Sequence, residues 1–253
     1  MQEKLPFALA SFLTWIAGFV DAVGYLSLQH IYTANMSGNS VAIGIQFASQ
    51  NWQETAKRFL PVVGYVIGLL FCRILIGLGA RKRIRTIASV SWMCEIALLV
   101  PACMSSAGDG RSWPVASIVY IGLLAAAMGI QNATLTHFSS LTINTGFVTG
   151  TLVKFAEQAT KYLSWLYDRV SSGTGIGRSL AESARQKHFR ATVWLALIWL
   201  AYIAGASCGA LSDYRFMLRA LAAPIGALVV LIAIDLRNPL GIIEEQAQAA
   251  HPA

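Results

Sequence analysis

The stretch GFVDA at residues 18–22, followed by TANMSGNSV at 33–41, places one carboxylate and one short polar break in an otherwise apolar run. The pattern returns as GIQNA at 129–133 and TGFVTGTLV at 145–153, which lie 111 and 112 residues further along the chain. The first copy carries an acid at depth and the second an amide. A duplicated, interrupted membrane segment is the sequence sign of a transporter whose site forms where two halves meet.

The composition is that of a polytopic membrane protein. The 253 residues are 56% hydrophobic and 12% charged, with a mean hydropathy of +0.57, whereas a soluble domain has about 25% charged residues. The net charge of +7 comes from basic residues beside apolar segments, where they set orientation and meet anionic lipid head groups. We therefore expect membrane lipid and no nucleic acid as a partner. The four cysteines show no metal-ligand spacing, so we expect no metal and no cofactor.

Eight apolar segments lie near 6–28, 38–48, 59–80, 86–104, 115–137, 146–156, 191–212 and 216–236. Six of them approach the roughly 20 residues that cross a bilayer. The second segment would give about 16 Å of helix against a hydrocarbon core of about 30 Å, and the sixth runs into charged residues. We predict an all-α integral membrane protein with six transmembrane helices and two short re-entrant or half-helices buried in protein. Eight full spans stay open as the alternative.

Basic clusters at 81–85 and 169–190 are expected on the cytoplasmic side. With six spans, both termini are then cytoplasmic. Three spans per half would invert the second half relative to the first, giving repeat one at 6–104 and repeat two at 115–236. The later motifs GYxxG at 64–68 and AYxxG at 201–205 support the repeat. A flexible basic cytoplasmic loop is expected at 162–190, and a polar tail at 237–253.

These paired motifs resemble the YoaK family of bacterial inner-membrane proteins, which is defined by the domain of unknown function 1275. The resemblance rests on 18–22, 33–39, 129–133 and 148–152 and covers nearly the whole chain. The family form of the second piece reads TGNMTGN, and here Ala and Ser replace its first Gly and second Thr. The resemblance implies a multi-pass protein of the cell inner membrane and assigns no catalytic or binding residue.

Asp21 is the sharpest candidate, because an ionisable residue inside a span is costly and is a functional candidate by default. Two interpretations stay open: a proton carrier, or a structural carboxylate that caps the broken helix through backbone N–H groups. Glu95 is a second deep carboxylate, which needs a partner such as Arg73 or Lys154. We assign proton or ion coupling to Asp21 and Glu95 as a hypothesis.

The remaining candidates for substrate binding are the amides, hydroxyls and glycines of the two copies: Asn35, Ser37, Gly38, Asn39, Gln131, Asn132, Thr145, Gly146, Thr149, Gly150 and Thr151. A half-helix that begins at a break directs its N–H groups inward, which suits an anion. The amides suit a polar neutral or zwitterionic substrate. The structural alternative is that small residues allow close packing and amides form interhelical hydrogen bonds.

The sequence favours a secondary transporter of a small polar or anionic metabolite, with its site between the breaks and Asp21 coupling transport to a proton. A passive channel or facilitator with the re-entrant segments as its filter is one alternative, and a structural membrane subunit without transport is another. No HExxH, GxSxG or nucleophile–His–carboxylate set indicates an enzyme. The sequence leaves open whether the chain forms a homo-oligomer.

Overall fold

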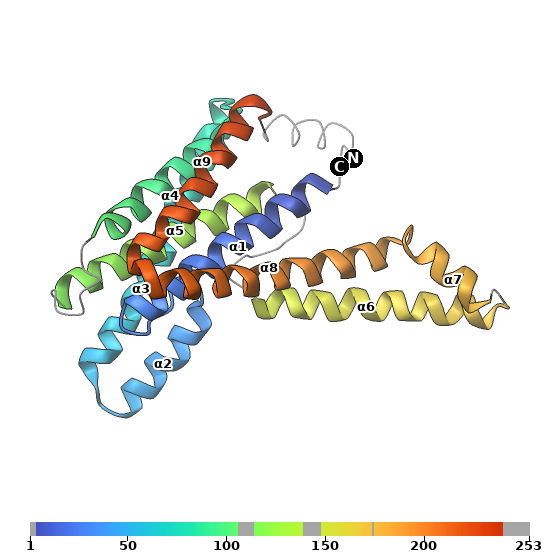
Figure 1. Ribbon diagram of the computed structural model, residues 1–253, viewed down its shortest axis with the longest axis horizontal. Helices are drawn as coiled ribbons and strands as arrows, with labels where there is room; N and C mark the ends of the chain where they lie inside the picture. The colour runs from blue at the N-terminus through green and yellow to red at the C-terminus, as the bar shows by residue number, and fades with distance from the viewer. Residues whose placement is uncertain (1–3, 106–113, 139–147, 174, 240–253) are drawn as a thin grey trace.

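The structure is a computed structural model and describes residues 4–105, 114–138, 148–173 and 175–239; in these residues it contains helices joined by turns and no strand (Figure 1). The elements are α1 (Lys4–Ser27), α2 (Met36–Ala48), α3 (Trp52–Arg81), α4 (Ile87–Met104), α5 (Pro114–Phe138), α6 (Val148–Ser171), α7 (Ile176–Ser183), α8 (Lys187–Phe216), the 3-10 helix η2 (Met217–Leu221) and α9 (Ala222–Arg237).

Five stretches are long and apolar enough to cross a membrane: Phe7–Ser27, Trp52–Arg81, Ile87–Met104, Ser117–His137 and Lys187–Arg237. The last has 51 residues and contains α8, η2 and α9, which the sequence predicts as two spans. Large apolar side chains also face outward, among them Ile67 at 58% and Ile74 at 63% exposed on α3. A lipid-facing surface explains that exposure. The prediction of a helical multi-pass membrane protein is therefore confirmed, and the count of six spans stays a prediction.

Two tightly packed helix pairs form the centre of the bundle, α1 with α8 and α3 with α5 (Figure 1). In the first pair, Gly205 lies against Trp15 and Gly209 against Phe19. The contacting residue numbers rise together, so α1 and α8 run parallel. In the second pair, Gly64 lies against Gly122 and Gly68 against Ala126. These numbers also rise together, so α3 and α5 run parallel. α4 then packs on α5 and α9.

Glycine is required where the helices of each pair touch. A Cβ at Gly18 would lie 2.2 Å from the carbonyl oxygen of Tyr202, and a Cβ at Gly129 would lie 2.2 Å from that of Tyr65. Gly129 follows Gly18 by 111 residues and Tyr202 follows Tyr65 by 137, the two offsets at which the motifs repeat. The same backbone contact is therefore made twice, each time between one half of the chain and the other.

The two predicted half-helices differ in the structure. α2 is short, with 13 residues. α6 does not end near residue 156: it has 24 residues and continues to Ser171. Its charged continuation is stabilised on the helix surface, where Lys161 Nζ lies 2.6 Å from Glu157 Oε1. The predicted short segment is thus the first part of a longer, amphipathic helix.

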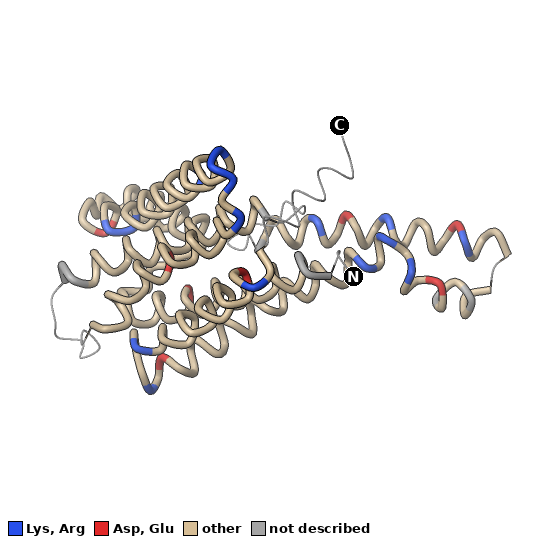
Figure 2. The backbone as a smooth tube through the Cα atoms, turned by 90° about the horizontal axis from the view of Figure 1, so that it is seen from above, with Lys and Arg blue, Asp and Glu red and all other residues tan. Residues whose placement is uncertain are grey.

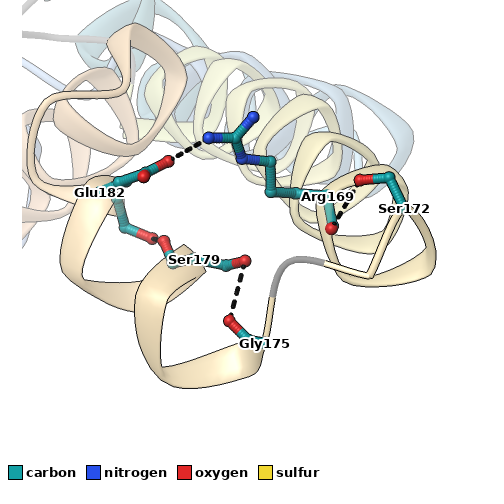
Figure 3. A network of polar contacts seen from close by, with 6 residues as sticks. Arg169, Ser172, Gly175, Ser179 and Glu182 are labelled. Atoms are coloured by element: carbon teal, nitrogen blue, oxygen red, sulfur yellow. Dashed lines mark hydrogen bonds and ion pairs between the residues drawn. The ribbon is translucent and has the colours of Figure 1, made fainter.

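Helices also occupy the range 162–190, where the sequence analysis expects a flexible loop. α6 turns at Gly173, whose φ is +85°, and α7 folds back beside it. Arg169 Nη2 lies 2.6 Å from Glu182 Oε2 and joins the two helices (Figure 3). α6, α7 and the first part of α8 project from the bundle as an arm (Figure 1). Lys and Arg positions, blue in Figure 2, lie along this arm and at the ends of the bundle.

Candidate functional site

The first break is built by a reversal of the chain after α1. Gln29 and His30 both take left-handed backbone conformations, with φ of 57° and 56°. Such conformations are uncommon for residues other than glycine, and they turn the chain back along α1. The segment that follows, which includes Thr33 and Ala34, then lies beside Asp21.

Asp21 is 3% exposed and accepts hydrogen bonds at both carboxylate oxygens. Oδ1 accepts from the backbone N–H of Thr33 at 2.7 Å and of Ala34 at 2.8 Å, and from the Thr33 hydroxyl at 3.3 Å. Oδ2 accepts from the hydroxyl of Tyr202 on α8 at 2.7 Å. Because a buried carboxylate needs such donors, this set, here called the Asp21 bridge, holds α1, the break and α8 together.

The other candidates of the first break bond mainly to the break itself. Asn35 caps α2, since its Oδ1 accepts from Gly38 N at 3.2 Å and from Ser37 Oγ at 2.8 Å. Asn39 is fully buried; its Nδ2 donates to Tyr32 O at 2.7 Å, and its Oδ1 accepts from Tyr32 N at 3.3 Å. Of the backbone N–H groups at this break, those of Thr33 and Ala34 are occupied by Asp21, and that of Gly38 in the first turn of α2 is occupied by Asn35.

The second copy places its amide in the matching position. Asn132 Nδ2 donates to the hydroxyl of Tyr65 on α3 at 2.7 Å. Thr145 and Gly146 lie outside the described residues. Thr149 and Gly150 are exposed in the first turn of α6 and Thr151 is buried, and this helix packs mainly on α8.

The two tyrosines, Tyr65 and Tyr202, are site residues that do not stand among the candidates from the sequence. Tyr65 and Tyr202 were visible as members of the GYxxG and AYxxG motifs. Their matched positions in the two halves are a signal that could identify them. Asp21 and Asn132 are equivalent in the repeat, so their partners, Tyr202 and Tyr65, should be equivalent too. Sequence alone left open which helix of one half meets which helix of the other.

Gln131 and Glu95 lie apart from the Asp21 bridge. Both are fully buried, and neither the two oxygens of Glu95 nor the side-chain oxygen and nitrogen of Gln131 have a hydrogen-bond partner among the described residues. Arg73, which the sequence analysis considered as a partner of Glu95, donates to the hydroxyl of Thr136 at 2.7 Å instead. Lys154, the other partner considered, makes no hydrogen bond to Glu95 either. The adjacent amides Gln131 and Asn132 therefore have different surroundings.

The described residues contain no group of three or more His, Cys, Asp or Glu side chains that could hold a metal ion. The groups gathered at the first break are one carboxylate, the hydroxyl of Tyr202, amides and backbone N–H groups. Such a set can bind and release a proton, and it can bind an anion or a polar neutral molecule through hydrogen bonds.

Comparison with known proteins identifies relatives of the chain. The model of a family described as "Protein of unknown function (DUF1275)" matches residues 9–234. The UPF0700 transmembrane protein YoaK of Bacillus subtilis (strain 168) is 27% identical over 209 residues, which cover 82% of this chain and 84% of that protein. No solved structure matches. These findings confirm the resemblance seen in the motifs.

Proposed function

Because the chain belongs to the DUF1275 family of proteins of unknown function, we propose its role from the site itself: proton-coupled secondary transport of a small anionic metabolite. The observation that carries this proposal is the pair of matched contacts between the halves, Asp21 with Tyr202 and Asn132 with Tyr65. Polar groups at helix breaks between two halves are the usual form of a transporter site.

The paired contacts support two inverted three-span repeats, with α1, α3 and α4 in one and α5, α8 and α9 in the other. The basic residues at 81–85 follow α3, and those at 178–190 lie just before and within the first turn of α8. The positive-inside rule places both on the cytoplasmic side. Since α8 runs parallel to α1 and α5 parallel to α3, α1 begins in the cytoplasm and α5 ends there. Equivalent helices then point in opposite directions, and both chain termini are cytoplasmic in the cell inner membrane.

Proton coupling follows from the bonding of Asp21. As a carboxylate it occupies the N–H groups of Thr33 and Ala34. A proton on Asp21 removes its charge and one of its acceptor sites, which weakens the bridge and frees these N–H groups. A carboxylate or other oxyanion of the substrate then takes the place of Asp21. Proton uptake and anion binding are thereby linked, so that one proton travels with the anion.

The two halves have different roles: the first carries the group that titrates, and the second supplies neutral hydrogen-bonding groups. The neutral pair of Asn132 and Tyr65 keeps its hydrogen bond at every physiological pH, because neither group titrates there. It supplies amide and hydroxyl groups for the other end of the substrate. Opening of either side requires the halves to move, and the Asp21–Tyr202 bond is a contact that this movement breaks. Protonation therefore favours the exchange between inward-facing and outward-facing states.

The test is uptake into proteoliposomes that contain the purified full chain. Labelled acetate, lactate and succinate serve as probes of small carboxylates. We expect saturable counterflow of at least one probe, with net uptake that rises when the outside is acidified. Asp21→Asn should abolish the response to the pH gradient, whereas Asp168→Asn, the same change at an exposed position on α6, should preserve it.

The other outcomes identify the alternatives. Flux that does not saturate would assign a channel or facilitator. Absence of flux for all carboxylates and for polar neutral probes, from protein that is folded, would favour a structural subunit. Saturable transport with an unchanged pH response in Asp21→Asn would remove Asp21 from coupling and leave the transporter proposal standing.

A further inference from the structure

α4 carries an acid in the middle of its buried face. Ala88, Trp92, Leu99 and Ala102 are at most 1% exposed and recur at helical spacing. Glu95 lies within this stripe at 0% exposed, close to the centre of the Ile87–Met104 helix. The candidate span Ile87–Met104 has the length and composition to cross the membrane, so Glu95 lies far from either surface. An apolar residue would be expected at such a position.

Polar side chains of three helices gather beside Glu95. The thiol of Cys72 on α3 lies 3.6 Å from Ser91 Oγ on α4 and 3.4 Å from Thr134 Oγ1 on α5. Glu95 is one turn beyond Ser91, and Gln131 is one turn before Thr134. Because α4 and α5 run in opposite directions (Figure 1), both steps lead the same way from Cys72. Glu95 and Gln131 thus lie at the same level, and neither side chain has a hydrogen-bond partner in the part of the chain that the structure describes.

The surroundings of Glu95 contain no neutralising cation among the described residues. α3 contributes Cys72, while the next residue, Arg73, is exposed and donates to Thr136 instead. α5 contributes the uncharged Gln131 and Thr134. On α9, Asp235 accepts from Ser89 Oγ, nearly two turns away along α4. On η2, Arg219 lies beside Cys103, about two turns away in the other direction. An ionised carboxylate in such surroundings is costly, so the neutral acid is the form that fits this packing.

We propose that Glu95 is an exchangeable proton site inside the membrane, in which Gln131, Ser91 and Thr134 stabilise the carboxylate by hydrogen bonds when the proton leaves. The O–H bond of the acid breaks, both electrons stay on the carboxylate, and the proton passes to water on the side then open. Gln131 Nε2 turns to donate to the carboxylate. The Ser91 and Thr134 hydroxyls, which now donate to Ile87 O and Ile130 O, turn likewise. This inference rests on the proposed function, because it adds a coupling proton separate from that of Asp21.

Infrared difference spectroscopy of the full chain in lipid nanodiscs tests the proposal without any substrate. Stepping the pH from about 5 to about 9 should remove a carboxylic-acid C=O band, since a buried Glu can titrate in this range. We expect a titrating band in Asp21→Asn, where Asp21 cannot contribute, and we expect that band to be absent when Glu95→Gln is added to this variant. Gln131→Leu should move its midpoint to higher pH, because the anion then lacks its amide donor. Replacing Na⁺ by choline should leave the midpoint unchanged.

Four results would overturn the proposal. The first is a band that never titrates, and the second is a titrating band that survives when Glu95→Gln is combined with Asp21→Asn. The third, which decides if Glu95→Gln does not fold, is a midpoint that Gln131→Leu leaves unmoved. The fourth is a midpoint that depends on Na⁺, which would assign a metal cation instead of a proton. Titration of Glu95 without counterflow would defeat the transporter proposal alone, whereas counterflow without titration would defeat this inference alone.

Discussion

The hydroxyl of Tyr202 donates to Asp21 Oδ2 at 2.7 Å, and the equivalent residues of the other helix pair, Tyr65 and Asn132, also meet at 2.7 Å. The two contacts have the same placement and differ in charge. The first joins a hydroxyl to a carboxylate, while the second joins a hydroxyl to an amide. The difference between the halves is therefore chemical, and it can be measured by removing each tyrosine hydroxyl in turn.

Tyr202→Phe should destabilise the protein more than Tyr65→Phe. A hydrogen bond to a charged group contributes about 1.5–3 kcal/mol and a neutral one about 1 kcal/mol. Thermal unfolding of both variants in the same detergent measures the difference. In the Asp21→Asn background, the additional effect of Tyr202→Phe should shrink. Equal losses for the two single variants would mean that Asp21 is not the charged partner of Tyr202.

Gly18→Ala and Gly129→Ala should each force a central helix pair apart. The added Cβ would lie 2.2 Å from a backbone carbonyl oxygen, which cannot rotate away. We expect a clear fall in unfolding temperature for both variants. Gly77→Ala is the control, since a Cβ there has nothing within 4 Å and alanine favours a helix by up to about 1 kcal/mol. A loss in Gly77→Ala equal to that in Gly18→Ala would contradict this account.

Asn39→Ala should loosen the first break. The side chain is buried and bonds both the N–H and the C=O of Tyr32, so its removal leaves two backbone groups without partners. Each such group costs about 1–3 kcal/mol. Hydrogen exchange in the segment after α1 should accelerate along with the loss of stability. Ser40→Ala, an exposed change one residue later, should leave exchange unaltered.

The Lys161 ammonium, which bonds to Glu157 and attracts it electrostatically, holds the pKa of that carboxyl below its usual range. Because the pKa of Glu157 is lower in the folded state than in the unfolded state, the ion pair stabilises the fold at pH values above the unfolded-state pKa. This stabilisation is lost as the pH falls through the folded-state pKa. Lys161→Gln should therefore accelerate hydrogen exchange in α6 at neutral pH and have no effect once Glu157 is protonated. The effect should be small, because both side chains are about half exposed. A pH-independent effect would show that the ion pair is not its cause.

Thiol labelling of intact cells should decide the number of spans. In a variant without native cysteines, His30→Cys reports on the exposed turn after α1. Six spans place this turn outside, where an impermeant maleimide labels it, and eight spans place it in the cytoplasm. Arg83→Cys, between α3 and α4, should be protected in both cases. Protection of His30→Cys and its labelling only after lysis would support eight spans.

Several features of the fold could be predicted from the sequence because they depend on local composition. Apolar length gave the long helices, and the run at 38–48 is too short to span, which agrees with the 13 residues of α2. The length of α6 could not be predicted from apolar composition. The second half of α6 is polar, so the apolar segment in the sequence ends at 156. The helix itself continues to Ser171, with the Lys161–Glu157 ion pair on its surface.

That this is a helical membrane protein with a duplicated, interrupted segment follows from the amino-acid sequence, because hydropathy and repeat spacing are properties of the chain alone. The tertiary structure decided which groups meet. Asp21 and Asn132 are equivalent in sequence, yet their partners, Tyr202 and Tyr65, lie 181 and 67 residues away. Such contacts depend on how helices of different halves pack, and the close approach at Gly18 and Gly129 sets that packing.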